Sequence, residues 1–542
     1  MVRCIVTYST KEIMLIIQNL SYTHPNKDLL FGNINLTVNS GEKVALIGNN
    51  GSGKSTLLKI MAGLLQPLNG SVNINVKPYY IPQIFGQYND LTIAEALGID
   101  KKLTALHKIL NGNVSEESYE ILNDDWTIED RCDEVLKHWK LNDLDLSQKM
   151  ENLSGGQKTK VFLAGISIHK PELILLDEPS NHLDFESPEL LYDFIRSTKS
   201  TLIVVSHDRK LLKILNKICE LSKNGITVYG GNFDFYTEQK QIEKNALAQD
   251  IHSKEKALKK AREKERETIE RQQKLDSRGK SKQEKSGVAK IMMNTLRNNA
   301  ENSTAKLKSV HTEKIGNIRD ELQDLRSSVV STEQMKFGFN SSTLHKGKVL
   351  FTAENINFKY TNSNFIWKIN LNLQILSGSR IAVKGSNGSG KTTFINILLG
   401  NLEPQQGTVF IKENKSVYID QDYSLINNHL KVYEQAQQFN TFNLEEHEVK
   451  IRLNRFLFTQ NTWDKTCSSL SGGERMRLML CCLSIGSESP DIIILDEPTN
   501  NLDIQNIEIL TSAIKDYQGT LIVISHDETF LDQINIDQTI KL

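Results

Sequence analysis

Residues 48–56 read GNNGSGKST, and this stretch decides the fold because it matches the phosphate-binding loop pattern GxxxxGK[ST]. Apolar residues at 44–47 predict a strand before the loop, and residues 57–61 predict a helix after it. Glycines let successive backbone N–H groups turn toward one anion, and the start of the helix adds its positive end. The stretch therefore predicts a strand, a phosphate-binding loop and a helix, in that order.

The same motifs occur a second time in the second half of the chain. Two copies of one α/β domain are therefore expected, each a P-loop NTPase domain. From Gln83 to Gln421 the spacing is 338 residues, but from Ser154 to Ser471 it is 317, so the first copy carries about twenty extra residues in this interval. The repeated segments are 48–56 and 385–393, 153–156 and 470–473, and 206–208 and 525–527.

The lysine and hydroxyl residues that close each loop are expected to bind ATP and its metal ion. Lys54 and Lys391 would meet the β and γ phosphates, while Ser55 and Thr392 would ligate Mg²⁺. A chance glycine-rich turn could explain one such loop, but not two in the same context. The residues predicted to bind ATP in these loops are Gly48, Asn49, Gly51, Gly53, Lys54, Ser55 and Thr56, and Gly385, Gly388, Gly390, Lys391, Thr392 and Thr393.

Two adjacent acids follow an apolar strand in each copy. Asp177 and Asp496 are expected to hold the water shell of Mg²⁺, and Glu178 and Glu497 to polarise the attacking water. A single Asp-Glu pair often only caps the next element. Here, however, each pair is followed 29 residues later by Ser-His-Asp at the end of another apolar run. The repeated pair therefore indicates catalysis.

Histidine and serine motifs complete each copy. His207 and His526 end predicted strands and are expected to contact the γ-phosphate. The Leu-Ser-Gly-Gly segments predict helix starts capped by serine, and a helix start that faces outward can bind a phosphate held by another domain. The residues predicted for this role are Ser154, Gly155 and Gly156, and Ser471, Gly472 and Gly473.

With these motifs in order twice, the chain resembles the ATP-binding cassette superfamily. The resemblance implies that Gln83 and Gln421 are Q-loop residues that contact ATP and Mg²⁺. It also implies that Tyr22 and Tyr360 stack on adenine, although a buried core tyrosine is the alternative. Family members dock two cassettes head to tail, so the chain is expected to be a monomer with an internal cassette sandwich. Lys54 would then face Ser471 and Gly473, and Lys391 would face Ser154 and Gly156.

Tandem cassettes joined by a charged helical linker resemble the ABC-F group in particular. The resemblance implies a ribosome-binding ATPase whose linker enters the tRNA exit site, contacts large-subunit rRNA and peptidyl-tRNA, and approaches the peptidyl-transferase centre. ATP would close the cassettes and hydrolysis would release the ribosome. Some members protect ribosomes from antibiotics, and others are translation factors. The alternatives are an ATPase subunit of a transporter with separate membrane domains and a DNA-repair or chromosome-maintenance ATPase.

The linker and domain boundaries follow from changes in composition. Residues 237–345 are rich in Lys, Glu, Arg, Gln and Ala, which favour helix. The polar stretch 276–287 is expected to break this helix into an antiparallel hairpin. The predicted segments are a tail at 1–13, a first cassette at 14–236 with a short arm near 97–140, the linker at 237–345 and a second cassette at 346–542.

The linker also carries the charge that predicts an RNA partner. The net charge of the chain is −1, but residues 251–310 hold 17 Lys and Arg against 8 Asp and Glu. A basic protrusion on an acidic body attracts phosphates, whereas a solvated helix face is the alternative. Residues 291–293 are a possible apolar element near the tip. The residues predicted to contact RNA are Arg271, Lys274, Arg278, Lys280, Lys282, Lys285, Lys290 and Arg297.

Bulk composition agrees with a cytoplasmic protein. The six cysteines show no metal-ligand or disulfide spacing, and Cys481 and Cys482 are expected to be buried thiols. No apolar run approaches the ~18 residues that a membrane span needs. The sequence therefore predicts a cytoplasmic protein without a membrane segment.

Overall fold

The computed structural model describes residues 12–24, 29–181, 183, 187–285, 309–326, 345–361, 364–386, 388–441, 443–486 and 490–542. The chain divides into two compact units. The first unit holds both cassettes, and the second spans Asp234–Thr332. Among the described residues, no helix combines the length and apolarity needed to cross a bilayer.

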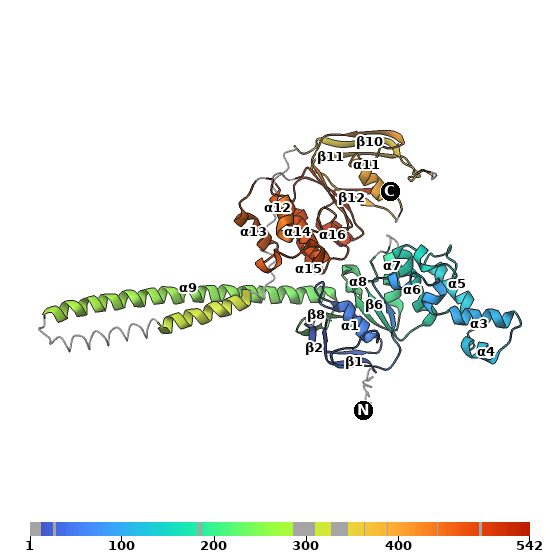
Figure 1. Cartoon of the computed structure of the whole chain (residues 1–542), viewed down its shortest axis with the longest axis horizontal. Coiled ribbons are helices and arrows are strands. Elements are labelled where there is room, and N and C mark those ends of the chain that lie inside the picture. The colour runs from blue at the N-terminus through green and yellow to red at the C-terminus, as the bar shows by residue number, and fades with distance from the viewer. Residues whose placement is uncertain are drawn as a thin grey trace, which may run out of the picture. The chain divides into compact units, whose positions relative to one another are not determined.

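The first cassette is built on two sheets (Figure 1). An antiparallel sheet has the order β2 (Leu29–Asn39), β1 (Ile13–Thr23), β4 (Asn69–Ile74). The larger sheet has the order β5 (Tyr79–Ile81), β6 (Leu173–Asp177), β7 (Thr201–Val205), β3 (Lys43–Ile47), β8 (Lys217–Ser222), β9 (Gly225–Tyr229), and all but its last pair are parallel. Its helices are α1 (Lys54–Met61), α2 (Ile93–Leu97), α3 (Asp100–Leu110), α4 (Glu116–Leu122), α5 (Ile128–His138), α6 (Gly155–His169), α7 (Ser187–Ser197) and α8 (Arg209–Ile214).

The second cassette repeats this plan. Its antiparallel sheet has the order β11 (Leu371–Leu376), β10 (Val349–Asn357), β13 (Gln406–Ile411). Its parallel sheet has the order β14 (Ser416–Ile419), β15 (Ile492–Asp496), β16 (Thr520–Ile524), β12 (Arg380–Lys384), β17 (Gln538–Lys541). Its helices are α11 (Lys391–Leu398), α12 (Val432–Gln438), α13 (Glu446–Arg455), α14 (Gly472–Ile485), α15 (Ile504–Asp516) and α16 (Glu528–Gln533). The predicted fold class, two P-loop NTPase cassettes in tandem, is confirmed.

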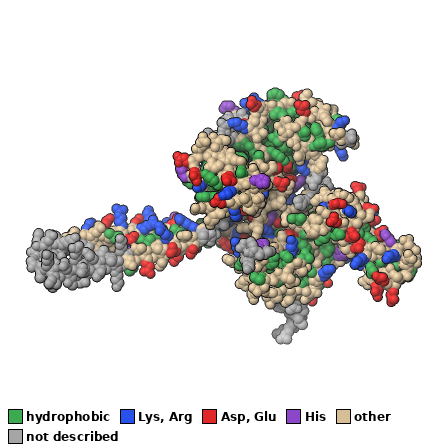
Figure 2. Space-filling view, in the orientation of Figure 1, with side chains coloured by type: hydrophobic (Ala, Val, Ile, Leu, Met, Phe, Trp, Pro, Cys, Tyr) green, Lys and Arg blue, Asp and Glu red, His purple; other side chains and the backbone are tan. Residues whose placement is uncertain are grey.

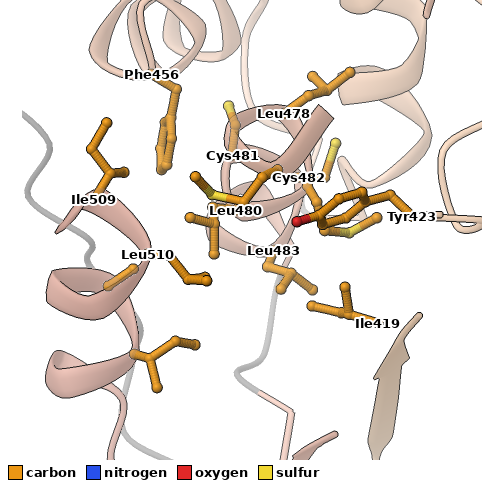
Figure 3. Packing of buried hydrophobic residues seen from close by; sticks show 14 of the residues in the cluster. Ile419, Tyr423, Phe456, Leu478, Leu480, Cys481, Cys482, Leu483, Ile509 and Leu510 are labelled. Atoms are coloured by element: carbon orange, nitrogen blue, oxygen red, sulfur yellow. The ribbon is translucent and has the colours of Figure 1, made fainter. Parts of the chain in front are cut away.

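The central parallel strands are mostly apolar, as expected for strands inside an α/β domain. All five residues of β7 and all five of β16 are buried. In the second cassette, α14 packs its apolar side chains against α12, α13 and α15 (Figure 3). Cys481 and Cys482 lie fully buried in this core, as predicted. Strands β6 and β15 end at Asp177 and Asp496, so the glutamates predicted to act in catalysis directly follow buried strands.

The extra residues of the first cassette form a small helical arm. Helices α3 and α4 contact each other closely, and α5 packs against α6 of the cassette body. Trp139 follows α5 and is fully buried, while Trp126 is 44% exposed and meets Tyr119 edge to face. The arm is therefore anchored by one tryptophan and presents the other to solvent.

The linker begins as one long helix, α9 (Phe233–Lys285). At ~1.5 Å per residue, its 53 residues span about 80 Å. Residues 309–326 form a second helix. Arg326 of this helix pairs with Glu255 of α9, and Arg319 lies in the same groove as Arg262. The later residue of one helix thus meets the earlier residue of the other, which shows that the two helices are antiparallel. Leu322 is buried in this contact. The linker is therefore a helical hairpin at the level of these residues.

The predicted helix break at 276–287 is wrong for residues 276–285, which continue α9 without interruption. Gly279 costs only about 1 kcal/mol in a helix, and the Lys, Gln, Glu and Arg residues around it are good helix formers. Lys and Arg side chains lie along the described part of the linker, with Asp and Glu among them (Figure 2). The possible apolar element at 291–293 lies outside the described residues.

Candidate functional site

The first phosphate loop lies between β3 and α1, as its sequence requires. Gly53 stands at the N-cap of α1 with φ of 96°, which favours glycine. The ammonium of Lys54 is buried, and it donates to the carbonyls of Gly48 (2.7 Å) and Asn49 (3.2 Å). The loop therefore curls around its own lysine, and the start of α1 points its free N–H groups into the same space.

The second phosphate loop has the same geometry. Gly390 caps α11 with φ of 90°. The ammonium of Lys391 donates to the carbonyls of Gly385 (2.7 Å) and Ser386 (3.2 Å). The two loops are thus equivalent in local structure, as the repeat predicts.

Side-chain oxygen atoms that could bind a metal ion lie beside the first loop. The Ser55 hydroxyl donates to Asp177 Oδ1 (3.0 Å), and the Tyr80 hydroxyl donates to Asp177 Oδ2 (3.4 Å). Ser52 Oγ is buried and has no hydrogen-bond partner in the described structure. Hydroxyl and carboxylate oxygens suit a hard cation such as Mg²⁺, and the unpaired hydroxyl leaves a polar group free toward a phosphate. These residues therefore fit Mg²⁺ and nucleotide.

The second site repeats part of this arrangement. The Tyr418 hydroxyl donates to Asp496 Oδ2 (2.8 Å). Ser389 Oγ is buried and unpaired, like its counterpart in the first loop. The same chemistry is therefore available beside both loops.

Each glutamate follows its aspartate at the end of a strand in a left-handed backbone conformation. The φ angles are 50° at Glu178 and 46° at Glu497. The backbone N–H of Glu178 donates to Val205 at 2.9 Å, so the residue is fixed to the neighbouring strand. A left-handed non-glycine residue is strained, and such strain is concentrated at functional sites. The same strained conformation therefore occurs at both residues that are predicted to polarise the attacking water.

Histidine lies against glutamate in both sites. His207 Nε2 is 3.3 Å from Glu178 Oε1, and the backbone N–H of His207 donates to Glu178 Oε2 at 3.3 Å. His526 Nε2 is 3.2 Å from Glu497 Oε1. The predicted catalytic pairs are therefore brought together in each cassette.

Burial controls the protonation of these groups. It raises the pKa of Glu178 to about 7 and the pKa of Glu497 to about 8, while the nearby loop lysine opposes the rise in each case. Burial, together with Lys54, lowers the pKa of His207 to about 3, so its imidazole is neutral at physiological pH. Burial also raises the pKa of Asp177. Carboxyls with pKa values near 7 can accept a proton from water.

These values predict different pH profiles for the two sites. In a Glu497→Gln chain only Glu178 remains as a base. Its carboxyl is protonated, and cannot accept a proton, at pH values below its raised pKa, so kcat/KM is expected to rise with pH through about 7. In a Glu178→Gln chain the rise is expected near pH 8. Steady-state ATPase assays between pH 5.5 and 9 measure both. Profiles already flat at pH 6, or the reverse order, would contradict the assignment.

The second cassette contacts the first phosphate loop through the segment that follows Asp496 and Glu497. The backbone N–H of Asn50 donates to Asp503 Oδ2 (2.8 Å), and its side chain donates to the Asn501 carbonyl (2.8 Å). Asn506 donates to the other oxygen of Asp503 and holds the carboxylate in place. The first loop is therefore braced by the other cassette.

A cavity of about 850 Å³ is lined by residues of both cassettes. It brings Lys54 and Glu178 together with Ser471, which agrees with one part of the head-to-tail prediction, whereas Lys391 does not line the cavity with Ser154 and Gly156. Predicted residues that line it are Gly51, Gly53, Lys54, Ser55, Thr56, Gln83, Ser154, Gly155, Gly156, Glu178, His207, Gln421, Ser471, Gly472, Glu497 and His526. Predicted residues outside its lining are Tyr22, Gly48, Asn49, Asp177, Tyr360, Gly385, Gly388, Gly390, Lys391, Thr392, Thr393, Gly473 and Asp496.

The serines of the two Leu-Ser-Gly-Gly segments cap helices, as predicted. Ser154 Oγ accepts from the backbone N–H of Gln157 (3.3 Å), and Ser471 Oγ accepts from that of Glu474 (3.3 Å). Both form complete capping boxes at the starts of α6 and α14. Their helix starts are therefore well ordered, and both face the shared cavity.

The two predicted adenine-stacking tyrosines have different surroundings. Tyr22 packs against Phe31 and His24, with ring centroids 6.1 and 6.2 Å away. Tyr360 is 54% exposed, and its hydroxyl lies 3.0 Å from the hydroxyl of Thr393 in the second loop. Tyr360 can therefore stack on a base, while His24 lines the cavity in the first site.

The sequence reasoning missed two tyrosines and the contact that Asp503 makes. Tyr80 and Tyr418 each lie three residues before the Q-loop glutamine and bond to the aspartate, so their equal spacing in both copies was a usable signal. Asp503 ends the segment 499–503, which repeats 180–184 and resembles the D-loop of the family. The partner of Asp503 had no local signal, because it lies 453 residues away.

The predicted RNA-binding residues lie on or beyond α9. Arg271, Lys274 and Arg278 are exposed on this helix. The helix includes Lys280, Lys282 and Lys285, but their side chains lie outside the described part of the structure. Lys290 and Arg297 lie wholly outside the described residues.

Comparison with protein families and curated sequences gives consistent matches. A family model described as ABC transporter matches residues 31–181 and 369–500. The chain is 31% identical to the probable ATP-binding protein YbiT of Escherichia coli O157:H7, over 96% of this chain and 94% of that protein. It is 28% identical to ABC transporter F family member 5 of Arabidopsis thaliana, over 92% of this chain and 70% of that protein.

A solved structure has the same fold. It is the complex of archaeal ribosomal stalk protein aP1 and archaeal ribosome recycling factor aABCE1, and the match covers 96% of this chain and 87% of that chain with a TM-score of 0.57. The sequence identity is 18%, so this likeness concerns the fold alone.

Proposed function

Because the chain belongs to the ATP-binding cassette family, as a tandem-cassette ATPase of the ABC-F group, we propose that it binds ribosomes and uses ATP to control that binding. The linker is proposed to enter the tRNA exit site, contact large-subunit rRNA and peptidyl-tRNA, and act in translation or in protection against antibiotics. The observation that carries this proposal is the helical hairpin with exposed Arg271, Lys274 and Arg278 between two complete cassettes.

Each cassette contributes residues to ATP hydrolysis. Lys54 and Lys391 bind the β and γ phosphates, and the bracing of Asn50 by Asp503 fixes the first loop. Ser55 with Asp177, and Thr392 with Asp496, would hold Mg²⁺, assisted by Gln83 and Gln421. When bound, Mg²⁺ neutralises charge on the phosphates.

The glutamates act as general bases. With its raised pKa, Glu178 can take a proton from the attacking water, and neutral His207 is within reach of its carboxylate to orient it. In the second cassette, Glu497 also has a raised pKa and can take the proton, and His526 Nε2 lies 3.2 Å from its carboxylate. Because the ATP sites would lie between the cassettes, bound ATP favours the closed form and hydrolysis removes that preference.

A transporter ATPase subunit is the alternative function. A transporter subunit would not need a 53-residue helix with exposed basic side chains after its first cassette. A role in DNA repair is disfavoured because coiled coil usually splits a cassette in those proteins, whereas here it joins two whole ones.

The test is co-sedimentation with purified ribosomes in the presence of ATP, using the Glu178→Gln and Glu497→Gln double variant to prevent release. Replacing Arg271, Lys274 and Arg278 with Gln is expected to weaken binding and to lower the slope of log affinity against log salt by up to about three. The loss follows because each phosphate contact releases a counterion.

The matched control replaces three exposed cassette lysines, Lys199, Lys223 and Lys515, with Gln. This control removes the same charge from the whole chain, so its binding is expected to stay unchanged. Equal losses in both variants would mean that net charge alone attracts the ribosome. If the parent double variant does not sediment while it still binds ATP, the ribosome is not the partner.

A further inference from the structure

We propose that Lys210, Glu528 and Lys384 form a one-sided link through which the two ATP sites influence each other. The inference rests on the proposed assignment of the two sites, and it goes further by naming the residues that couple them. The equivalent positions in the repeat do not form these ion pairs, so the two cassettes are joined by one such link and not by a symmetrical pair.

The link crosses between the cassettes at one carboxylate. Glu528 Oε2 lies 2.5 Å from Lys210 Nζ of the first cassette. Glu528 Oε1 lies 3.9 Å from Lys384 Nζ of its own cassette. The Lys210 ammonium and, less strongly, the Lys384 ammonium lower the pKa of Glu528, so the carboxyl is ionised at physiological pH. One charged side chain therefore ties both lysines together.

The first end of the link is attached to the catalytic pair of the first site. Asp208 caps α8 and accepts from the backbone N–H of Lys210 (2.9 Å). Asp208 directly follows His207, which lies 3.3 Å from Glu178. A shift of His207 on nucleotide binding is therefore expected to move Asp208 and, through the first turn of α8, Lys210.

The second end reaches the phosphate loop of the second site. Lys384 is the last residue of β12, and the next residue, Gly385, accepts from the Lys391 ammonium at 2.7 Å. Glu528 itself begins α16 two residues after His526. Movement of Glu528 therefore affects both the loop and the histidine of the second site.

The repeat shows why this link has no counterpart. A threonine and an isoleucine stand where the two lysines would be, and an arginine stands where the glutamate would be, so no ion pair can form. Arg209 donates instead to Gln533 of the second cassette (2.9 Å). The equivalent positions, from the motif spacings of 319 and 337 residues, are Lys210 and Thr529, Glu528 and Arg209, and Lys384 and Ile47.

The expected strength of the link is modest. The side chains of Lys210 and Glu528 are each 42% exposed, so solvent screens their attraction. Partly exposed ion pairs change an equilibrium by about two- to fivefold. Because coupling between two binding sites is reciprocal, occupancy of either site is expected to change the affinity of the other by the same factor.

The experiment is a titration of the full chain with the fluorescent nucleotide mant-ATP, in the Glu178→Gln and Glu497→Gln background that prevents turnover. Adding Lys54→Ala leaves only the second site to bind. The coupling is the ratio of the second site's Kd with the first site empty to its Kd with the first site occupied. Lys210→Gln, and separately Glu528→Gln, are expected to bring this ratio closer to one by about two- to fivefold.

The control for Lys210→Gln is Thr529→Ala, at the equivalent position, which is expected to leave the ratio unchanged. A charge exchange, Lys210→Glu with Glu528→Lys, restores attraction between the cassettes but sets two ammonium groups against each other at positions 528 and 384. Coupling is expected to stay low in this variant and to return when Lys384→Glu is added.

Two results would overturn the link. One is an unchanged ratio in both Lys210→Gln and Glu528→Gln. The other is full recovery by the two-residue exchange alone, which would mean that Lys384 takes no part. If Lys54→Ala fails to remove one binding step, the assignment of the sites is wrong, and this outcome is distinguishable from failure of the link.

Discussion

The chain in which Glu178 and Glu497 are both replaced by Gln is expected to hydrolyse ATP about 10²- to 10³-fold more slowly, because each site loses its general base. Glutamine has nearly the same shape, so nucleotide binding is expected to persist. The measurements are single-turnover phosphate release and mant-ATP binding on the same preparation. Binding retained with hydrolysis lost would place both glutamates in the chemical step.

The single variants are the controls for this result. Glu178→Gln and Glu497→Gln should each keep one active site, so each is expected to retain a measurable rate. Rapid ATP turnover in the double variant would contradict the role of these glutamates as general bases. A complete loss in one single variant would show that one site carries all of the hydrolysis.

Gly53→Ala is expected to destabilise the first cassette by about 2–5 kcal/mol and to abolish nucleotide binding there. A Cβ at this position would lie 2.7 Å from two ring atoms of Phe31, and its φ of 96° is already unfavourable for alanine. The phenylalanine is fully buried, so it cannot move aside. Both the backbone strain and the clash therefore act on the loop at the start of α1.

Gly51→Ala is the matched control for the clash. Its φ is 79°, but a Cβ there meets no atom within 4 Å. It is therefore expected to cost only the backbone strain, about 1–2 kcal/mol. Urea unfolding of both variants compares the two costs. Equal destabilisation would show that Phe31 does not constrain the loop.

The fold and the phosphate chemistry were predictable because they depend on local sequence. The central strands are largely apolar, and each phosphate loop is bounded by such a strand and a helix. The two glutamates that we propose as general bases directly follow their strands, so predicting the strand also placed the acid. Repetition of every motif then excluded chance matches.

Other parts of the site depend on contacts that no local pattern records. The bond from Asn50 to Asp503 joins residues 453 positions apart, so it appears only after the cassettes have folded and met. The hydroxyl of Tyr80 reaches Asp177 because β5 pairs with β6. Such contacts are set by sheet order and cassette docking, which a sequence pattern does not specify.

The predicted helix break in the linker was wrong for a different reason. The stretch around Gly279 is polar and contains a glycine, which favoured a break. Its other residues have high helix propensity, and a helix that is already formed propagates easily across one glycine. Propensity summed along the segment was therefore a better guide than the single glycine.

The buried thiols make this chain suitable for site-specific labelling. The five described cysteines, Cys132, Cys219, Cys467, Cys481 and Cys482, are free and buried. Burial raises the pKa of Cys132 to about 11 and that of Cys219 to about 12, so little reactive thiolate forms at neutral pH. After Cys4 is replaced by Ser, a maleimide dye should react only with a cysteine introduced on the surface. A dye on each cassette would then report opening and closing in real time by energy transfer.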